Sequence, residues 1–204
     1  FVDGQALYRS SKEAFGYTHP NYDVQKLTDK IAAQKDWQVA KIYFYTGIPE
    51  RSEDQFWHGF WVAKLAVMGT RRIGVFTRPL RYADQKIECR HCHKKEIVRV
   101  AREKGIDVRL ALDVVRLALH DSYDVGLIFS QDQDLSEVVD EVRELSKRQK
   151  RWIKLASAYP VSASYANGRG INGMAWIPID KSLYDSCIDP ADYRPRDVFN
   201  PAFP

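Results

Sequence analysis

Short apolar runs alternate along the chain with longer segments in which apolar residues recur every three or four positions. The short runs predict strands, and the segments with helical spacing predict helices. The predicted strands lie at 1–2, 41–46, 73–77, 125–130 and 152–156, and the predicted helices at 24–34, 53–68, 107–120 and 135–149. Strands that alternate with helices of this length are typical of βαβ units. The sequence therefore predicts an α/β domain with a mostly parallel central sheet covered by helices on both faces.

Two regions depart from this alternation. Residues 80–100 are hydrophilic and rich in basic side chains, which predicts a hairpin-like insertion. The last part of the chain holds most of the prolines, including Pro178, Pro190, Pro195, Pro201 and Pro204. We therefore expect a domain over residues 1–158 and an irregular C-terminal arm, residues 159–204, that packs on it.

Composition narrows the class of protein. The chain has 204 residues, of which 45% are hydrophobic and 12% aromatic, so it can build a packed core and is not expected to be disordered. No apolar run approaches the ~18 residues that a membrane span needs. Three cysteines exclude a disulfide scaffold and favour a reducing, cytoplasmic compartment. The chain starts at Phe1, inside an apolar run, so residues upstream of it are expected.

Charge is strongly segregated along the chain. Residues 71–104 carry 11 basic and 4 acidic side chains, whereas residues 105–145 carry 3 basic and 10 acidic ones. Two interpretations fit this pattern. Carboxylates could gather around metal ions beside basic surfaces that hold a polyanion, or the charged blocks could simply be solvated helix faces.

Several aspartates lie where a parallel sheet binds its ligands, at the carboxyl ends of strands. Asp3 ends the first predicted strand, and Asp132 and Asp134 follow the fourth. Asp113 lies in an apolar helix, where a carboxylate is costly unless it is paired or bound to a cation. Oxygen ligands suit Mg²⁺ or Mn²⁺. Each residue also has a structural interpretation: Asp3 as a turn residue, Asp134 as a helix N-cap and Asp113 on an exposed stripe.

Three blocks of sequence resemble a known family. They are FVDGQALY at residues 1–8, KGIDVRLALD at 104–113 and SQDQDL at 130–135. Together they are similar, in order, to the blocks of NYN domains of the LabA type, a branch of the PIN-like nucleases, and the similarity covers about residues 1–155. The resemblance implies a three-layer α/β/α PIN-like (Rossmann-like) fold and metal-dependent cleavage of RNA, or of single-stranded nucleic acid.

The resemblance also implies roles for single residues. It makes Asp3, Asp113, Asp132 and Asp134 the catalytic, metal-binding carboxylates, with Ser130 as a polar neighbour that contacts nucleic acid. Asp107 matches an acidic position that we expect to cap a helix. Two residues depart from the family pattern: Ala6 stands where Asn is usual, and Gln131 replaces a small residue.

Basic side chains near aromatic ones suit single-stranded nucleic acid, because phosphates pair with cations while bases stack on rings. The candidate residues for nucleic-acid binding are Arg71, Arg72, Arg78, Arg81, Lys94, Lys95 and Arg169. An ordinary solvated surface is the alternative.

Two further sequence motifs, CxxC and GxGxxG, contribute little to the functional interpretation. Cys89 and Cys92 form a single CxxC without a second pair nearby, so Zn²⁺ binding is not expected. Residues 168–173 match GxGxxG but neither follow a strand directly nor open a helix, and we interpret them as a flexible loop.

The leading hypothesis is a nuclease that uses carboxylate-held Mg²⁺ or Mn²⁺ to hydrolyse phosphodiester bonds. The alternative is a catalytically weak or inactive NYN module that binds nucleic acid in regulation, which Ala6 favours. A phosphatase or nucleotide-binding enzyme on a similar sheet is a third hypothesis, but no phosphate-binding glycine loop follows Asp3. A homo-oligomer is compatible with the sequence.

Overall fold

The computed structural model describes residues 1–88, 91–163 and 168–195. At its centre the short strand β1 (Val2–Asp3) joins two parallel three-stranded sheets. On one side it pairs with β2; on the other side Val2 bridges to Phe129, just after β6, and Phe129 N donates to Phe1 O at 2.9 Å. The order is therefore β3-β2-β1-β6-β7-β8, with β2 (Tyr43–Ile48), β3 (Gly74–Pro79), β6 (Val125–Ile128), β7 (Lys154–Pro160) and β8 (Ala175–Ile179).

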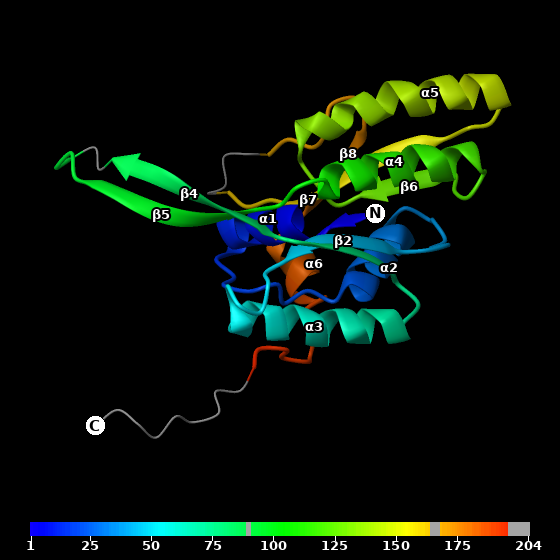
Figure 1. The fold of residues 1–204 in the computed structure, drawn as a ribbon. Coiled ribbons are helices and arrows are strands. Elements are labelled where there is room, and N and C mark those ends of the chain that lie inside the picture. The colour runs from blue at the N-terminus through cyan, green and yellow to red at the C-terminus, as the bar shows by residue number, and fades with distance from the viewer. Residues whose placement is uncertain (89–90, 164–167, 196–204) are drawn as a thin grey trace.

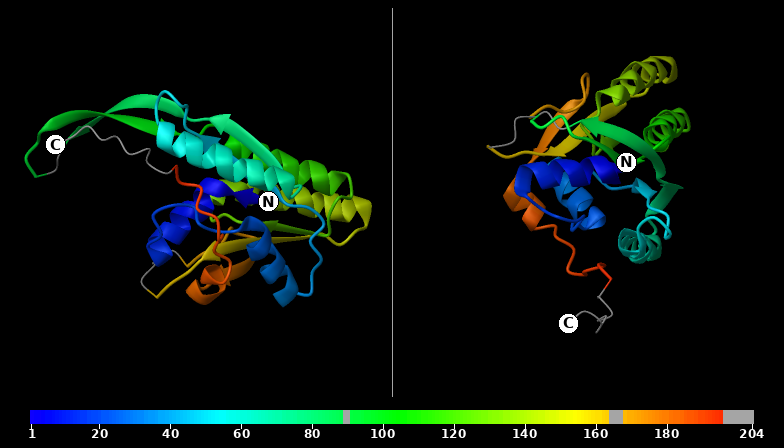
Figure 2. Two further views of the ribbon diagram at one scale, coloured as in Figure 1. Left: turned by 90° about the horizontal axis from the view of Figure 1, so that it is seen from below. Right: turned by 60° about the vertical axis from the view of Figure 1, so that its left-hand side comes forward.

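Helices cover both faces of this sheet (Figures 1 and 2). One hydrophobic core joins the sheet to α1 (Gly4–Phe15), α2 (Val24–Gln34), α3 (Gln55–Thr70) and the short α6 (Lys181–Asp185). A second core joins the other face to α4 (Ile106–Leu119) and α5 (Glu137–Gln149), and the 3₁₀ turn η1 (Gln133–Ser136) leads into α5. The predicted α/β/α fold with parallel strands is confirmed.

The helix α1 has no counterpart among the sequence predictions. It buries Leu7 and Ala14, but the rest of its inner face is Gly4, Ser10 and Ser11. Small polar residues allow the helix to lie close to the sheet, and they also remove the apolar stripe that would reveal a helix. The helix ends at Gly16, whose φ of 81° is a conformation that favours glycine.

A long hairpin projects from the body of the molecule (Figures 1 and 2). Strands β4 (Arg81–Glu88) and β5 (Lys95–Arg102) form it through eight antiparallel residue pairs. Its side chains are mostly exposed, and Arg99 ties it to the body through an ion pair with Glu53. This is the region from which the sequence predicted a basic insertion.

The C-terminal part of the chain is more regular than expected. The arm predicted at 159–204 contains β8, which pairs with β7 as the outermost strand of the sheet, and α6. The prolines of this region predicted an irregular arm, but Pro178 lies within β8, opposite Tyr159 of β7. An edge strand tolerates proline, since its outer N–H groups need no partner in the sheet.

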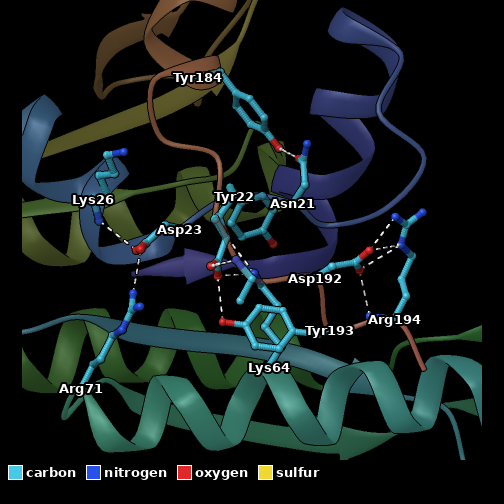
Figure 3. Close-up of polar contacts among 12 residues, drawn as sticks. Asn21, Tyr22, Asp23, Lys26, Lys64, Arg71, Tyr184, Asp192, Tyr193 and Arg194 are labelled. Atoms are coloured by element: carbon cyan, nitrogen blue, oxygen red, sulfur yellow. Dashed lines mark hydrogen bonds and ion pairs between the residues drawn. The ribbon is translucent and has the colours of Figure 1, made fainter. Parts of the chain in front are cut away.

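A buried lysine anchors the end of this segment to the core (Figure 3). Lys64 of α3 is 1% exposed; its Nζ donates to Tyr22 O at 2.9 Å and pairs with Asp189 at 3.3 Å. The Nζ also lies over the ring of Tyr193, 4.9 Å from its centre. Burial lowers the pKa of Lys64, and the charge of Asp189 opposes that shift. Asp189 and Tyr193, which follow α6, are thus part of the folded body.

None of the helices in the described ranges is long and apolar enough to cross a membrane.

Candidate active site

Four acidic residues gather at the carboxyl ends of the central strands. Asp3 ends β1, Asp132 follows β6, Glu103 lies between β5 and α4, and Asp107 lies in the first turn of α4. The charges of Asp107 and Asp132 raise the pKa of Asp3, and the charges of Asp3 and Asp107 raise that of Glu103. Elements far apart in the sequence therefore bring these carboxyl groups within electrostatic reach of one another.

Asp3 is 4% exposed and has two functions in the structure. Its Oδ1 accepts hydrogen bonds from Gln5 N at 3.1 Å and Ala6 N at 2.9 Å, which caps α1. The pKa of Asp3 is raised to about 6: burial is the largest cause, the charges of Asp107 and Asp132 add to it, and the two cap hydrogen bonds oppose it. Asp3 thus caps α1 and also belongs to the group of acidic residues.

Glu103 and Asp107 are acidic residues that the sequence did not assign to this group. Glu103 accepts a hydrogen bond from Gly47 N, and burial raises its pKa to about 7. Burial and then the charge of Asp132 raise the pKa of Asp107. The positive charge of Arg9 opposes both shifts, so Arg9 of α1 also lies near the group.

The expectation that Asp107 caps a helix was wrong. Helix α4 starts at Ile106, its N-cap is Gly105 with φ of 77°, and no side chain caps it. The stretch Lys104-Gly105 is the sequence signal that could have shown this, because glycine after a strand can turn the chain into the helix one residue earlier. Asp107 is therefore available to face the other carboxylates.

Asp132 and Asp134 are exposed and lie on the turn after β6. Asp132 Oδ1 accepts from Asp134 N at 3.0 Å and caps η1. The charge of Asp134 raises the pKa of Asp107, so it also lies near the group. Asp134 is not the N-cap of α5, which begins after Ser136. Ser130 is 3% exposed, and its Oγ accepts from Asp132 N at 3.2 Å, which supports the turn.

Asp113 lies apart from the group of four acidic residues. It is 5% exposed on α4 and forms ion pairs with Arg109 at 2.9 Å and Arg116 at 3.0 Å, while Tyr45 Oη donates to it at 3.1 Å. Burial opposes ionisation, but these hydrogen bonds outweigh it and lower the pKa of Asp113. Six residues of helix separate Asp113 from Asp107 by about 9 Å. The structure therefore neutralises Asp113 locally and does not bring it to the other carboxylates.

The donor chemistry of the group suits a hard divalent cation, because it offers only carboxylate oxygens and their mutual repulsion favours a positive ion. Their positions do not yet form a ligand shell. Within the described ranges, no three His, Cys, Asp or Glu side chains are grouped so that they could hold a metal ion. Binding would require exposed side chains such as Asp132 to turn towards Asp3.

The basic candidates around β3 and the hairpin fall into two sets. Arg78 is the next-to-last residue of β3 and lies beside the start of α4, since a Cβ added to Gly105 would meet Arg78 Nη1 at 3.4 Å. Arg81 begins the hairpin next to it, and Lys94 and Lys95 lie near the hairpin tip. Arg71 and Arg72 precede β3, at the opposite edge of the sheet from the carboxylates.

Arg71 has a structural partner there, an ion pair with Asp23 at 2.7 Å (Figure 3). The structure therefore does not bring Arg71 and Arg72 to the acidic group.

Arg169 lies near the group because its loop is tied to the turn after β6. Gln131 Nε2 donates to Arg169 O at 2.8 Å, and Gln133 Nε2 donates to Gly170 O at 3.1 Å. Ser10 Oγ of α1 donates to Gln131 Oε1 at 2.9 Å. The glycine-rich stretch is thus a loop beside the acidic group, and the unusual Gln131 connects it to α1.

Of the two cysteines of the CxxC motif, Cys89 lies outside the described residues and Cys92 is exposed.

Comparison with known proteins found one family model and one solved structure that are similar to this chain. A family model described as the NYN domain matches residues 1–157. No curated protein matches the chain. The crystal structure of a protein of unknown function from Vibrio parahaemolyticus RIMD 2210633 is similar at 17% identity, with a TM-score of 0.50, over 88% of this chain and 90% of that chain. At that identity the similarity concerns the fold alone.

Proposed function

Because this chain belongs to the NYN family of PIN-like proteins, we propose that it is a metal-dependent nuclease that hydrolyses phosphodiester bonds of RNA or single-stranded nucleic acid. The observation that supports this proposal most is the gathering of Asp3, Glu103, Asp107 and Asp132 at the carboxyl edge of the sheet. Ligands of open parallel sheets bind at this edge.

The acidic group would hold Mg²⁺ or Mn²⁺ through Asp3, Asp107 and Asp132, with Asp134 beside them. A divalent cation supplies an activated water and neutralises charge on the phosphoryl group. Asp3 is the best-placed ligand because its cap hydrogen bonds hold Oδ1 rigidly at the start of α1. Asp113 is proposed as a residue that supports α4 and Tyr45 rather than as a ligand.

Glu103 is the group best able to exchange a proton. With a pKa of about 7 it is partly protonated at neutral pH, which is the range in which a carboxyl group works as a general acid or base. Its hydrogen bond from Gly47 N orients the carboxyl group beside Asp3. A bound cation would favour its ionised form.

Basic side chains surround the group on the surface. Arg9, Arg78, Arg81 and Arg169 lie at the carboxyl edge or beside it, and the hairpin extends the basic surface outward. Contacts of this kind bind phosphates without reading sequence. The described geometry thus fits a flexible strand whose backbone passes over the carboxylates.

Incubation of the protein with labelled single-stranded RNA and DNA, in Mn²⁺ or in EDTA, tests this proposal. We expect cleavage in Mn²⁺ only, and a loss of at least about 100-fold in Asp132→Asn. The matched control is Asp140→Asn, because Asp140 is an exposed aspartate of α5 away from the group. Equal cleavage by wild type and Asp132→Asn would refute the assignment.

A catalytically weak NYN module that binds nucleic acid is the second candidate. Two observations favour it: Ala6 in place of the usual Asn, and the lack of a grouped set of metal ligands in the described part of the chain. Ala6 lies in the first turn of α1, and its N–H binds Asp3. If this candidate is right, the protein shifts the RNA in a gel without Mn²⁺-stimulated cleavage, and Ala6→Asn raises or restores cleavage.

A further inference from the structure

Helix α4 carries an apolar stripe on the face opposite the core. Its inner face buries Ile106, Leu110, Val114 and Leu117. On the outer face Val108 is 63% exposed, Leu112 62% and Leu119 51%, and Val115 between them is partly buried. Three of the most exposed large apolar side chains of the described chain thus lie on one side of one helix.

The spacing of these residues is the spacing of a helix–helix interface. Val108, Leu112, Val115 and Leu119 follow one another at intervals of four, three and four residues, which is the a/d repeat of paired helices. The stripe runs for 11 residues, or about 16 Å along the helix. A scattered apolar residue on a surface needs no explanation, but a continuous stripe with this repeat indicates a partner helix.

The two flanks of the stripe carry opposite charges. Arg109 and Arg116 lie on one flank, where Asp113 holds both. The neighbouring helix α5 lies on the other flank. Because Arg143 of α5 bonds Gly173 O, helical geometry places the exposed Glu137 and Glu141 on the side towards α4. Arg148 lies on the same side but pairs with Glu144 at 3.5 Å, so this flank is acidic on balance.

We propose that this stripe binds the same stripe of a second copy of the chain, with the two α4 helices parallel about a two-fold axis. In that arrangement the arginine flank of each copy meets the acidic flank of the other. An antiparallel pair would instead set arginines against arginines and the acidic flanks against each other. The stripe is complementary to itself, as a two-fold interface requires.

The proposed interface lies next to the acidic group, because Val108 directly follows Asp107 in α4. Helix α4 lies on the outside of the molecule beside α5, and the hairpin leaves from its N-terminal end (Figure 1). A parallel pair would place both acidic groups at the same end of the dimer. The proposal nevertheless rests on α4 and α5 alone and holds whether or not the protein is a nuclease.

Sedimentation equilibrium of the chain tests the dimer. We expect a mass of twice 23.6 kDa in the micromolar range, and at least a tenfold higher dissociation constant for Leu112→Lys. Val62→Lys is the matched control, because Val62 is a 52% exposed valine on α3. Circular dichroism and melting must show that both variants are folded. A monomer at all concentrations, or a dimer insensitive to Leu112→Lys, would overturn the proposal.

A cross-linking experiment tests the orientation. With Cys89 and Cys92 replaced by serine, Leu119→Cys is expected to form a disulfide dimer, because parallel helices bring equivalent residues together. In an antiparallel pair centred on the stripe, the two residues would lie about 16 Å apart, beyond the reach of a disulfide. Val62→Cys serves as the control for random collision. Dimers in solution without cross-linking at Leu119→Cys would refute the parallel arrangement.

Discussion

Asp3 shows how a single residue can stabilise a helix and yet destabilise the fold. Its hydrogen bonds cap α1, but its carboxylate is buried near other negative charges, and its pKa lies at about 6 instead of 3.8. Because the pKa in the folded state is the higher one, the group costs stability above pH 6, and that cost disappears as the pH falls below 3.8. Binding of a cation would remove the same cost.

The variant Asp3→Asn separates the two effects. Asparagine caps helices as well as aspartate does, so we expect the free energy of unfolding at pH 8 to increase by about 1–3 kcal/mol, with little change at pH 4. Urea unfolding at both pH values measures this, and nuclease activity is expected to be lost. Asp23→Asn is the control: Asp23 caps α2, and although burial opposes it, the cap hydrogen bond from Lys26 N and the partner Arg71 lower its pKa, so this variant should lose stability at pH 8.

Asp113 is expected to behave differently from Asp107. Asp113→Asn removes the charge that holds Arg109 and Arg116, so it should cost about 1–3 kcal/mol of stability. It should retain most of the cleavage rate of the wild type. Asp107→Asn should instead leave the stability of the protein unchanged and abolish cleavage. If Asp113→Asn were as inactive as Asp107→Asn at a temperature where both are folded, the supporting role of Asp113 would be wrong.

At the scale of elements, the hairpin is the part most easily altered without harm to the core. Its residues are mostly exposed and its strands pair chiefly with each other. We expect the triple variant Arg81→Gln, Lys86→Gln, Lys94→Gln to bind single-stranded RNA more weakly, with a smaller dependence of the dissociation constant on salt, because fewer phosphates are neutralised.

The control for that variant is Lys147→Gln, Arg148→Gln, Lys150→Gln. These basic residues lie at the end of α5, at the opposite edge of the sheet from the carboxylates. They should leave RNA binding nearly unchanged. Fluorescence anisotropy over a salt series measures both variants, and equal salt slopes for the two would exclude the hairpin as a binding element.

Apolar periodicity predicted the elements that bury apolar stripes and missed those that do not. The helix predicted at 24–34 coincides with α2, and the strands β2, β3, β6 and β7 lie within a few residues of their predicted positions. Helix α1 was missed because its inner face contains serines, and β8 was missed because it contains Pro178. In both elements contacts distant in sequence outweigh the local pattern.

Local sequence signals also account for which acidic residues of the candidate site were predicted and which were not. Strand ends located Asp3 and Asp132, because the end of a strand can be recognised locally. Glu103 and Asp107 required knowledge of how α4 meets the sheet, and the ion pairs of Asp113 depend on helix spacing together with Tyr45 of a distant strand. Charge segregation along the chain fitted either an acidic centre or solvated helix faces, and Asp3 and Glu103 lie outside the acidic block at 105–145.

At the scale of the whole molecule, the C-terminal segment is held by a buried charge. Lys64→Met would leave Asp189 buried without its partner, so we expect a loss of about 3 kcal/mol in urea unfolding. Adding Asp189→Asn should recover part of that loss. Lys26→Met, at an exposed position of α2, should have little effect. If Lys64→Met were as stable as wild type, the anchoring role of the lysine would be wrong.

A direct titration with Mn²⁺ tests, without any substrate, the proposal that carboxylates from distant elements form one cation site. Calorimetry at pH 8 and pH 5 should show binding that weakens at the lower pH, because protons then occupy Asp3 and Glu103, whose pKa values are about 6 and 7. Asp107→Asn should weaken the binding at least tenfold, whereas Asp140→Asn should not. Absence of Mn²⁺ binding at pH 8, or equal binding by Asp107→Asn, would contradict the account.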